Sequence, residues 1–389
     1  MPSAELATLI KKSLTPRLDQ FTERVNKQLV LAAHDMIGNL KPGEHKDIPH
    51  VYMLTQHMVA KASASVFVGE TLADDPYLID SFKNMVIEVA KTRNTPRPWL
   101  EPFEKGQAFY QWWIGKTSPV VKRHRAQLHN AVAPTVHERV ARAKAEGDAY
   151  QRPDDLLQDV IDMYPTRKRR IDLMRFVVDM LTLLIFAALH TTSENSTLVI
   201  YRLLQHPEVM DALVEEQEAV LQEEGLPKDA PSTMLTRKMI KKLDKLDSAC
   251  RESFRLKNDY LALPHLYTGK KPLTLSNGAV IKPGERAIIN SWMNHTSSGT
   301  PASATHGYDS WDPYRFFGKD KQATKISEDY LFFGLGKHAC PGRFFAIQEV
   351  KVLISALLRE YKLSAPSGVV FPTNDTIRLP QGVLRIEKR

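Results

Sequence analysis

Apolar residues recur along this chain at intervals of three and four, the spacing that gathers side chains on one face of an α-helix. This pattern predicts helices at about residues 4–38, 50–68, 76–95, 106–146, 153–163, 170–205, 207–225, 232–256 and 343–359. The longest, at about 170–205, stops before Pro207, because the residue before a proline is disfavoured in a helix. Pro207 then opens the next helix, which Gly225 ends.

Strand-like patterns occur only late in the chain. Three short apolar stretches are separated by two turns, Ser276-Asn277-Gly278 and Lys282-Pro283-Gly284, and lie at 273–275, 279–281 and 287–289. Asn-Gly between apolar runs is a strong hairpin signal. A further strand pair is predicted around 376–378 and 383–386. The fold class expected from these patterns is mainly α with a minor β region.

Composition is that of a globular protein with a large core. The chain has 389 residues, of which 43% are hydrophobic and 25% charged, enough for one or two domains. Its two cysteines, Cys250 and Cys340, give no disulfide framework, which favours a reducing compartment. The formal net charge of +8 favours a partner with an acidic surface.

Neither a membrane span nor a nucleic-acid site is predicted. The first residues contain no signal-peptide core, and the most apolar segment, 176–189, is interrupted by Asp179 and too short to cross a bilayer. The basic run 167–170 has the composition of a nucleic-acid patch, but no aromatic residues are interleaved with it. We interpret it as a solvated turn.

The chemistry of the chain is concentrated between Phe333 and Gly342, where Phe-x-x-Gly-x-x-x-Cys-x-Gly precedes the helix at 343–359. Gly336 and Gly342 permit tight backbone turns. Cys340 lies where that helix begins, so unpaired N–H groups and the helix dipole are expected to favour its thiolate. A thiolate on a rigid loop suits axial ligation of haem iron, and Phe333 can pack against a flat cofactor or the loop. The alternative, a buried structural cysteine in a turn, accounts for neither the phenylalanine nor both glycines.

This loop resembles the haem-binding loop of the cytochrome P450 family, with all four signature positions in register. The resemblance implies a cytochrome P450 fold as a single domain over residues 1–389. It also implies haem b held through Cys340, and electrons from NADPH delivered by NADPH–cytochrome P450 reductase. His338 stands where members place a basic residue that meets a haem propionate.

Two distant segments fit the same resemblance. Glu252 and Arg255, three apart on a predicted helix, share a face and can pair, although alone such a pair is a weak signal. Arg315 lies in the segment Asp312-Pro-Tyr-Arg-Phe, between that helix and the cysteine loop. The resemblance implies that Glu252, Arg255 and Arg315 form a network bracing the haem loop. The alternative is three unrelated surface charges.

The longest predicted helix carries the run Ala187-Ala-Leu-His-Thr-Thr192. Small residues there let a flat cofactor approach the backbone, and the resemblance gives Thr191 the role of relaying protons to bound oxygen. Ala188 and His190 replace the glycine and the acid usual in the family. Histidine titrates near neutrality and can shuttle protons or position water. The alternative is that His190 faces a neighbouring helix and has no catalytic part.

The start of the chain, residues 5–18, resembles the third major helix of the family. We therefore expect the family's membrane anchor and first strands to be absent. Eukaryotic members usually lie on the cytosolic face of the endoplasmic reticulum membrane. Without an anchor this chain is expected to be cytoplasmic or peripheral, with a membrane surface retained as a contact.

The resemblance is to fungal secondary-metabolism members, which implies a monooxygenase that oxidises a small lipophilic metabolite such as a terpenoid or a polyketide. Two alternatives stay open. One is a haem-thiolate isomerase or dehydratase that needs no redox turnover. The other is an inactive, truncated family member.

Overall fold

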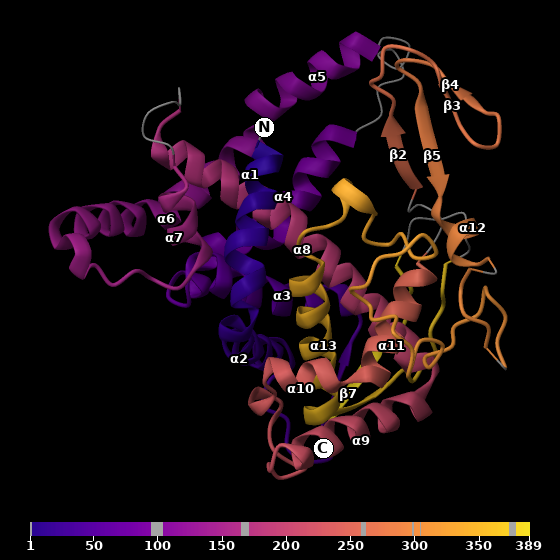
Figure 1. The fold of residues 1–389 in the computed structure, drawn as a ribbon. Helices are drawn as coiled ribbons and strands as arrows, with labels where there is room; N and C mark the ends of the chain where they lie inside the picture. The colour runs from indigo at the N-terminus through magenta and orange to yellow at the C-terminus, as the bar shows by residue number, and fades with distance from the viewer. Residues whose placement is uncertain are drawn as a thin grey trace.

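Helices make up most of the molecule (Figure 1). The computed structural model describes residues 2–94, 104–164, 171–257, 262–297, 299–303, 305–372 and 379–389. The α-helices are α1 (Pro2–Leu9), α2 (Leu18–Ile37), α3 (Val51–Val68), α4 (Pro76–Asn94), α5 (Glu104–Thr117), α6 (Pro119–Glu146), α7 (Leu156–Asp162), α8 (Leu173–Gln205), α9 (Pro207–Glu223), α10 (Arg237–Lys242), α11 (Asp244–Arg255), α12 (Ser291–His295) and α13 (Arg343–Glu360). The basic run 167–170 lies outside the described residues.

The strands are short and antiparallel. Those described are β1 (His45–Ile48), β2 (Ala262–Leu266), β3 (Leu273–Thr274), β4 (Val280–Ile281), β5 (Arg286–Asn290), β6 (Tyr361–Ser364) and β7 (Leu384–Lys388). They form three sheets, ordered β1-β7-β6, β2-β5 and β3-β4. The expected class, mainly α with a minor β region, is confirmed.

The hairpin predicted from Asn277-Gly278 is confirmed and joins β3 to β4. Gly278 has φ +84°, in the left-handed region that glycine adopts freely, and the Asn277 side chain accepts the Ala279 N–H over 3.0 Å. β5 does not extend this hairpin but pairs with β2.

The C-terminal strand β7 lies between two partners that the sequence pattern did not suggest. It pairs with β6 on one side and with β1, more than 300 residues away in sequence, on the other. The expected strand at 376–378 lies outside the described residues.

Three helices predicted as continuous are interrupted. The first becomes α1, a π-helical turn at Ile10–Leu14, a 3₁₀ turn at Thr15–Arg17 and then α2. Pro16 lies at this break and has no N–H to continue the ladder. Pro119 separates α5 from α6 in the same way and stands at the first position of α6. The helix expected at 232–256 is divided into a 3₁₀ turn, α10 and α11, with a non-helical ψ of 75° at Leu243.

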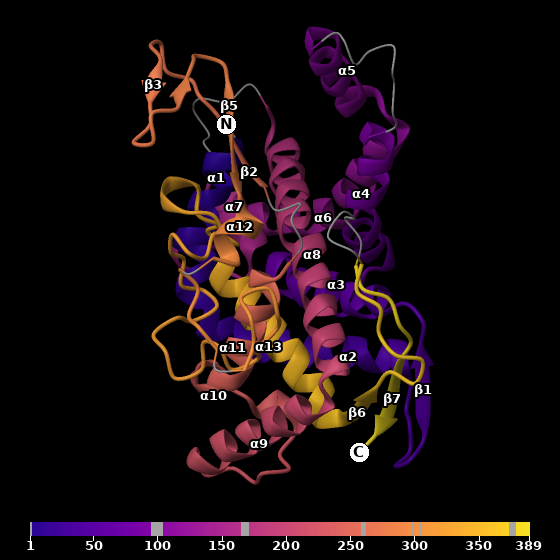
Figure 2. The same ribbon diagram turned by 90° about the vertical axis from the view of Figure 1, so that its right-hand side faces the viewer.

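Other helices pack around the central helix α8. Its N-cap is Asp172, whose side chain accepts the Arg175 N–H over 2.7 Å, and the helix crosses the molecule between the other helices (Figure 2). It contacts α1, α3, α4, α6, α7, α9, α11 and α13. By length and composition alone it is the one described helix that could cross a membrane, and half of its most apolar window is buried. Its contacts on several sides are those of a core helix.

Helix α13, which follows the cysteine loop, packs against α2, α8 and α9. It carries Glu349, which is fully buried. The Ser63 hydroxyl donates to Glu349 Oε1 over 3.0 Å, and Oε2 has no hydrogen-bonding partner among the described residues. Burial raises the pKa of this carboxyl to about 8, so Glu349 is protonated at neutral pH.

We expect Glu349→Gln to flatten the pH dependence of stability. The folded chain keeps a proton that the unfolded chain, with a carboxyl pKa of 4.5, has lost. The free energy of unfolding should therefore fall as pH rises from about 4.5 towards about 8, by up to about 1.4 kcal/mol per pH unit. Urea unfolding of parent and variant at several pH values measures this. An equal fall in both proteins would contradict the assignment.

Candidate functional site

The cysteine loop, residues 331–342, precedes α13 and is closed by its own backbone. The Cys340 N–H donates to the Phe333 carbonyl over 2.7 Å. Gly336 has φ +61°, so the tight turn predicted there is confirmed. Gly334, which the sequence did not single out, has φ +70°, and an added Cβ would lie 3.0 Å from the His338 carbonyl oxygen. The loop therefore requires glycine at 334 and 336.

The prediction that a side chain at Gly342 would block a tight turn is wrong. Its φ of −85° and ψ of 0° lie in the right-handed region that other residues adopt, and an added Cβ would meet nothing within 4 Å. What Gly342 provides is room beside the cavity that it lines.

The Cys340 thiol is held at the start of α13. Burial raises the pKa of this thiol, and the opposing effects of the Gly342 N–H, the Arg343 charge and the Arg343 N–H are smaller. The helix start thus acts in the expected direction, towards the thiolate, but burial outweighs it. A metal cation next to the sulfur would reverse the balance, because coordination deprotonates a thiol. The other cysteine, Cys250, is fully buried within α11.

A cavity of about 460 Å³ separates the cysteine loop from α8. Its lining is predominantly apolar. The lining residues are Leu6, Ile10, Leu14, Phe67, Leu184, Ala187, Ala188, Thr191, Thr192, Asn195, Phe254, Lys257, Phe332, Phe333, Gly334, His338, Cys340, Pro341, Gly342, Phe345, Ala346, Ile347 and Val350. The structure thus brings together the predicted residues Phe333, His338, Cys340, Gly342, Ala188 and Thr191 around one space. Gly336 shapes the loop without lining the cavity.

Neighbouring residues of α8 face different spaces. Thr191 lines the cysteine cavity, and its hydroxyl donates to the Ala187 carbonyl over 2.8 Å. His190 lines a second cavity, where its Nδ1 lies 2.7 Å from the Tyr52 hydroxyl of α3. His190 therefore does not line the cysteine cavity.

His338 is exposed at the rim of the cysteine cavity. Its ring stands edge-on to His265 of β2, with centroids 5.6 Å apart. Phe333 packs edge-on against Phe332, with centroids 4.7 Å apart. The propionate contact expected of His338 stays a prediction.

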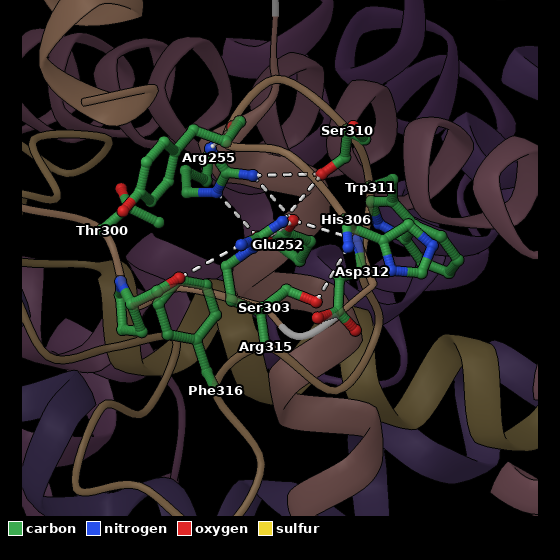
Figure 3. Close-up of polar contacts among 12 residues, drawn as sticks. Glu252, Arg255, Thr300, Ser303, His306, Ser310, Trp311, Asp312, Arg315 and Phe316 are labelled. Carbon is green, nitrogen blue, oxygen red and sulfur yellow. Dashed lines mark hydrogen bonds and ion pairs between the residues drawn. The ribbon is translucent and has the colours of Figure 1, made fainter. Parts of the chain in front are cut away.

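Glu252, Arg255 and Arg315 meet in one buried cluster (Figure 3). The Glu252 carboxylate accepts Arg255 Nε and Nη2, both over 2.7 Å, and Arg315 Nε over 2.9 Å. It also accepts the Asp312 N–H over 3.0 Å. Arg315 Nη2 donates in addition to the Gly307 carbonyl, over 2.8 Å. The alternative of three unrelated surface charges is wrong, because all three side chains are inaccessible to solvent.

His295 of α12 links this cluster to the cysteine loop. Its Nδ1–H donates to the Arg255 carbonyl over 3.1 Å, and its Nε2 accepts the Leu331 N–H over 2.8 Å. Burial lowers the pKa of His295 to about 4, so the ring is neutral and can accept at Nε2. Phe254 stacks on Phe332 with centroids 4.8 Å apart, next to the same loop. We call Glu252, Arg255, Arg315 and His295 the brace.

The sequence of this chain was compared with those of known proteins. The Cytochrome P450 family model matches residues 4–389. This chain belongs to the cytochrome P450 family. It is 28% identical to the cytochrome P450 monooxygenase AN1598 of Emericella nidulans, over 95% of this chain and 66% of that protein. It is 29% identical to the cytochrome P450 monooxygenase olcJ of Penicillium canescens, over 97% and 69%.

A third relative is the cytochrome P450 monooxygenase 103 of Postia placenta, 30% identical over 82% of this chain and 61% of that protein. The chain thus spans about two thirds of the length of the curated relatives it matches. The cytochrome P450 family binds haem through a cysteine thiolate on iron, and the residues present fit that group. Cys340 lines one side of an apolar cavity whose α8 wall includes the small Ala187 and Ala188.

Sequence reasoning missed four residues of this cytochrome P450 site. Gly334 stands at a free position of the motif and is marked only by its residue type. His295, Asn195 and Lys257 have no motif spacing that marks them, because their placement depends on how α8, α11 and α12 come together.

We expect Glu252→Gln to reduce the free energy of unfolding by about 3–5 kcal/mol, because it leaves two buried guanidinium groups without a counter-charge. Denaturant unfolding followed by circular dichroism measures this loss. Glu224→Gln is the control, since Glu224 pairs with Lys238 and Lys242 at the surface and should matter little. Equal, small effects of both substitutions would contradict the brace.

Proposed function

We propose that this chain binds haem through Cys340 and acts as a monooxygenase on a small lipophilic metabolite, with residues 1–389 as one domain. The observation that carries the proposal is the apolar cavity in which Cys340 lines one wall and Thr191 of α8 the other. The names of the relatives, which are monooxygenases, support the same activity.

The first role of the protein in this reaction would be to hold the haem. Cys340 would ligate the iron, while Phe333, Gly342 and Ala188 would border the macrocycle and His338 would meet a propionate at the rim. When bound, the haem supplies the activation of O2 and its insertion into a substrate bond. The N–H groups of Gly342 and Arg343, together with the Arg343 charge, lower the pKa of the Cys340 thiol and so would favour its thiolate once the iron is bound.

Thr191 is the residue that we assign to proton delivery. Its hydroxyl lines the cavity, and its proton is held by the Ala187 carbonyl one helical turn away. A hydroxyl in this position can accept one proton while it donates another, which is the requirement for a relay.

The lining of the cavity and the net charge of the chain support a class of substrate and of partner. A predominantly apolar cavity favours a lipophilic substrate, such as a terpenoid or polyketide of fungal secondary metabolism. Electrons would come from NADPH through NADPH–cytochrome P450 reductase, and the net charge of +8 supports docking with an acidic partner surface. Such partners are usual at the cytosolic face of the endoplasmic reticulum membrane.

We expect the reduced, CO-bound protein to show the red-shifted Soret band of thiolate ligation, and Cys340→Ala to lose it because no other thiol reaches the cavity among the described residues. Cys250→Ala is the matched control and should keep the band. A Cys340→Ala protein with an unchanged spectrum would overturn the proposal.

With reductase, product formation should require NADPH and O2. Product formed without NADPH would instead indicate an isomerase or dehydratase.

A further inference from the structure

A second cavity, of about 910 Å³, lies against α8 beside the loop that leads to β7. Tyr52, His190 and Glu194 line it, together with Pro380 and Gln381 of that loop. None of these residues lines the cysteine cavity. The two cavities are therefore distinct spaces next to the same stretch of helix.

The wall between them is one helix thick. His190 and Glu194, four residues apart, share the face of α8 that lines the second cavity. Thr191 and Asn195, also four apart, share the adjoining face that lines the cysteine cavity. Polar side chains thus occupy both sides of the same turn.

Lys257, just beyond the end of α11, connects the two faces. It is 7% exposed and lines the cysteine cavity. Its Nζ donates to Asn195 Oδ1 over 2.9 Å and lies 3.3 Å from Glu194 Oε1. Burial lowers the pKa of this ammonium, against the opposing effect of Glu194, so the group gives up a proton more readily than an exposed lysine does.

Polar groups continue from this ion pair into the second cavity. His190 Nε2 lies 4.0 Å from Glu194 Oε2, a separation that one side-chain rotation closes or one water bridges. On the other side of the ring, Nδ1 lies 2.7 Å from the Tyr52 hydroxyl. Burial raises the pKa of Tyr52 to about 12, so this hydroxyl keeps its proton and can orient the imidazole.

We propose that Lys257 and Glu194 form a route by which protons pass from the second cavity into the cysteine cavity. The inference rests on the proposed monooxygenase function and adds to Thr191 the groups that resupply protons from the far side of α8. For each proton delivered, Lys257 Nζ gives one to an acceptor in the cysteine cavity. The Glu194 carboxylate next takes a proton from water of the second cavity, either directly or through protonated His190, which water then reprotonates, and passes this proton to the neutral Lys257 amine. One proton is moved, and every group returns to its starting charge.

The decisive comparison is between two oxidants. Turnover with NADPH and O2 draws protons from the protein, whereas hydrogen peroxide brings oxygen, electrons and protons together. We expect Lys257→Met to lower product per NADPH about tenfold or more, with peroxide released instead. Turnover driven by hydrogen peroxide should fall far less than turnover with NADPH. The probe is 7-ethoxycoumarin, whose dealkylation gives a fluorescent phenol.

Glu194→Gln should act like Lys257→Met, and the double variant should be no worse than either, because both remove one route. Binding of the probe, followed by the haem absorbance shift, should not change in Glu194→Gln, because Glu194 does not line the cysteine cavity. Lys351→Met is the matched control: Lys351 is also buried and ion-paired, 3.2 Å from Asp247 Oδ1, but lines neither cavity.

Two results would overturn the route. Unchanged product per NADPH in Lys257→Met would show that protons enter elsewhere. An equal loss with both oxidants would show that the ion pair only holds α8 against α11. Failure of the proposed function is separate: the parent protein would then fail to turn over the probe with either oxidant.

Discussion

The buried carboxylate of Glu252 is the group on which the site depends. Its charge allows Arg255, three residues away, and Arg315, 63 residues away, to be buried beside it. The Arg255 backbone in turn receives the Nδ1–H of His295, whose other nitrogen accepts the Leu331 N–H at the start of the cysteine loop. A single negative charge thus joins α11, α12 and the loop that carries Cys340. Its contribution is geometric: it fixes where the thiol stands relative to α8.

Helix α8 forms the wall of the cavity opposite the Cys340 thiol. It is buried over much of its length, and a run of polar residues at 190–195 lies where the two cavities adjoin. His190, which stands where the resemblance led us to expect an acid, fits this arrangement. His190 faces the second cavity, so the groups next to the cysteine cavity are Thr191, Asn195 and Lys257.

Sequence patterns predicted the elements that depend on residues close together in the chain. The period of the apolar residues located α8, Asn277-Gly278 located the β3–β4 hairpin, and motif spacing placed Glu252 with Arg255. The failures have nonlocal causes. The pairing of β7 with β1 and β6 depends on register across the whole chain, and no pattern near Lys257 indicates that it borders a cavity. At Cys340 the sequence indicates the helix start but not the burial of the sulfur, which has the larger effect on the thiol pKa.

The brace would present Cys340 to a haem iron as its thiolate ligand. The thiol pKa is raised in the protein alone, so the ligand state depends on the iron, and the iron is where it should be observed. X-ray absorption at the iron edge of the haem-loaded protein measures this directly. We predict one sulfur atom in the first coordination shell in addition to the porphyrin nitrogens. A first shell containing only nitrogen and oxygen would contradict it.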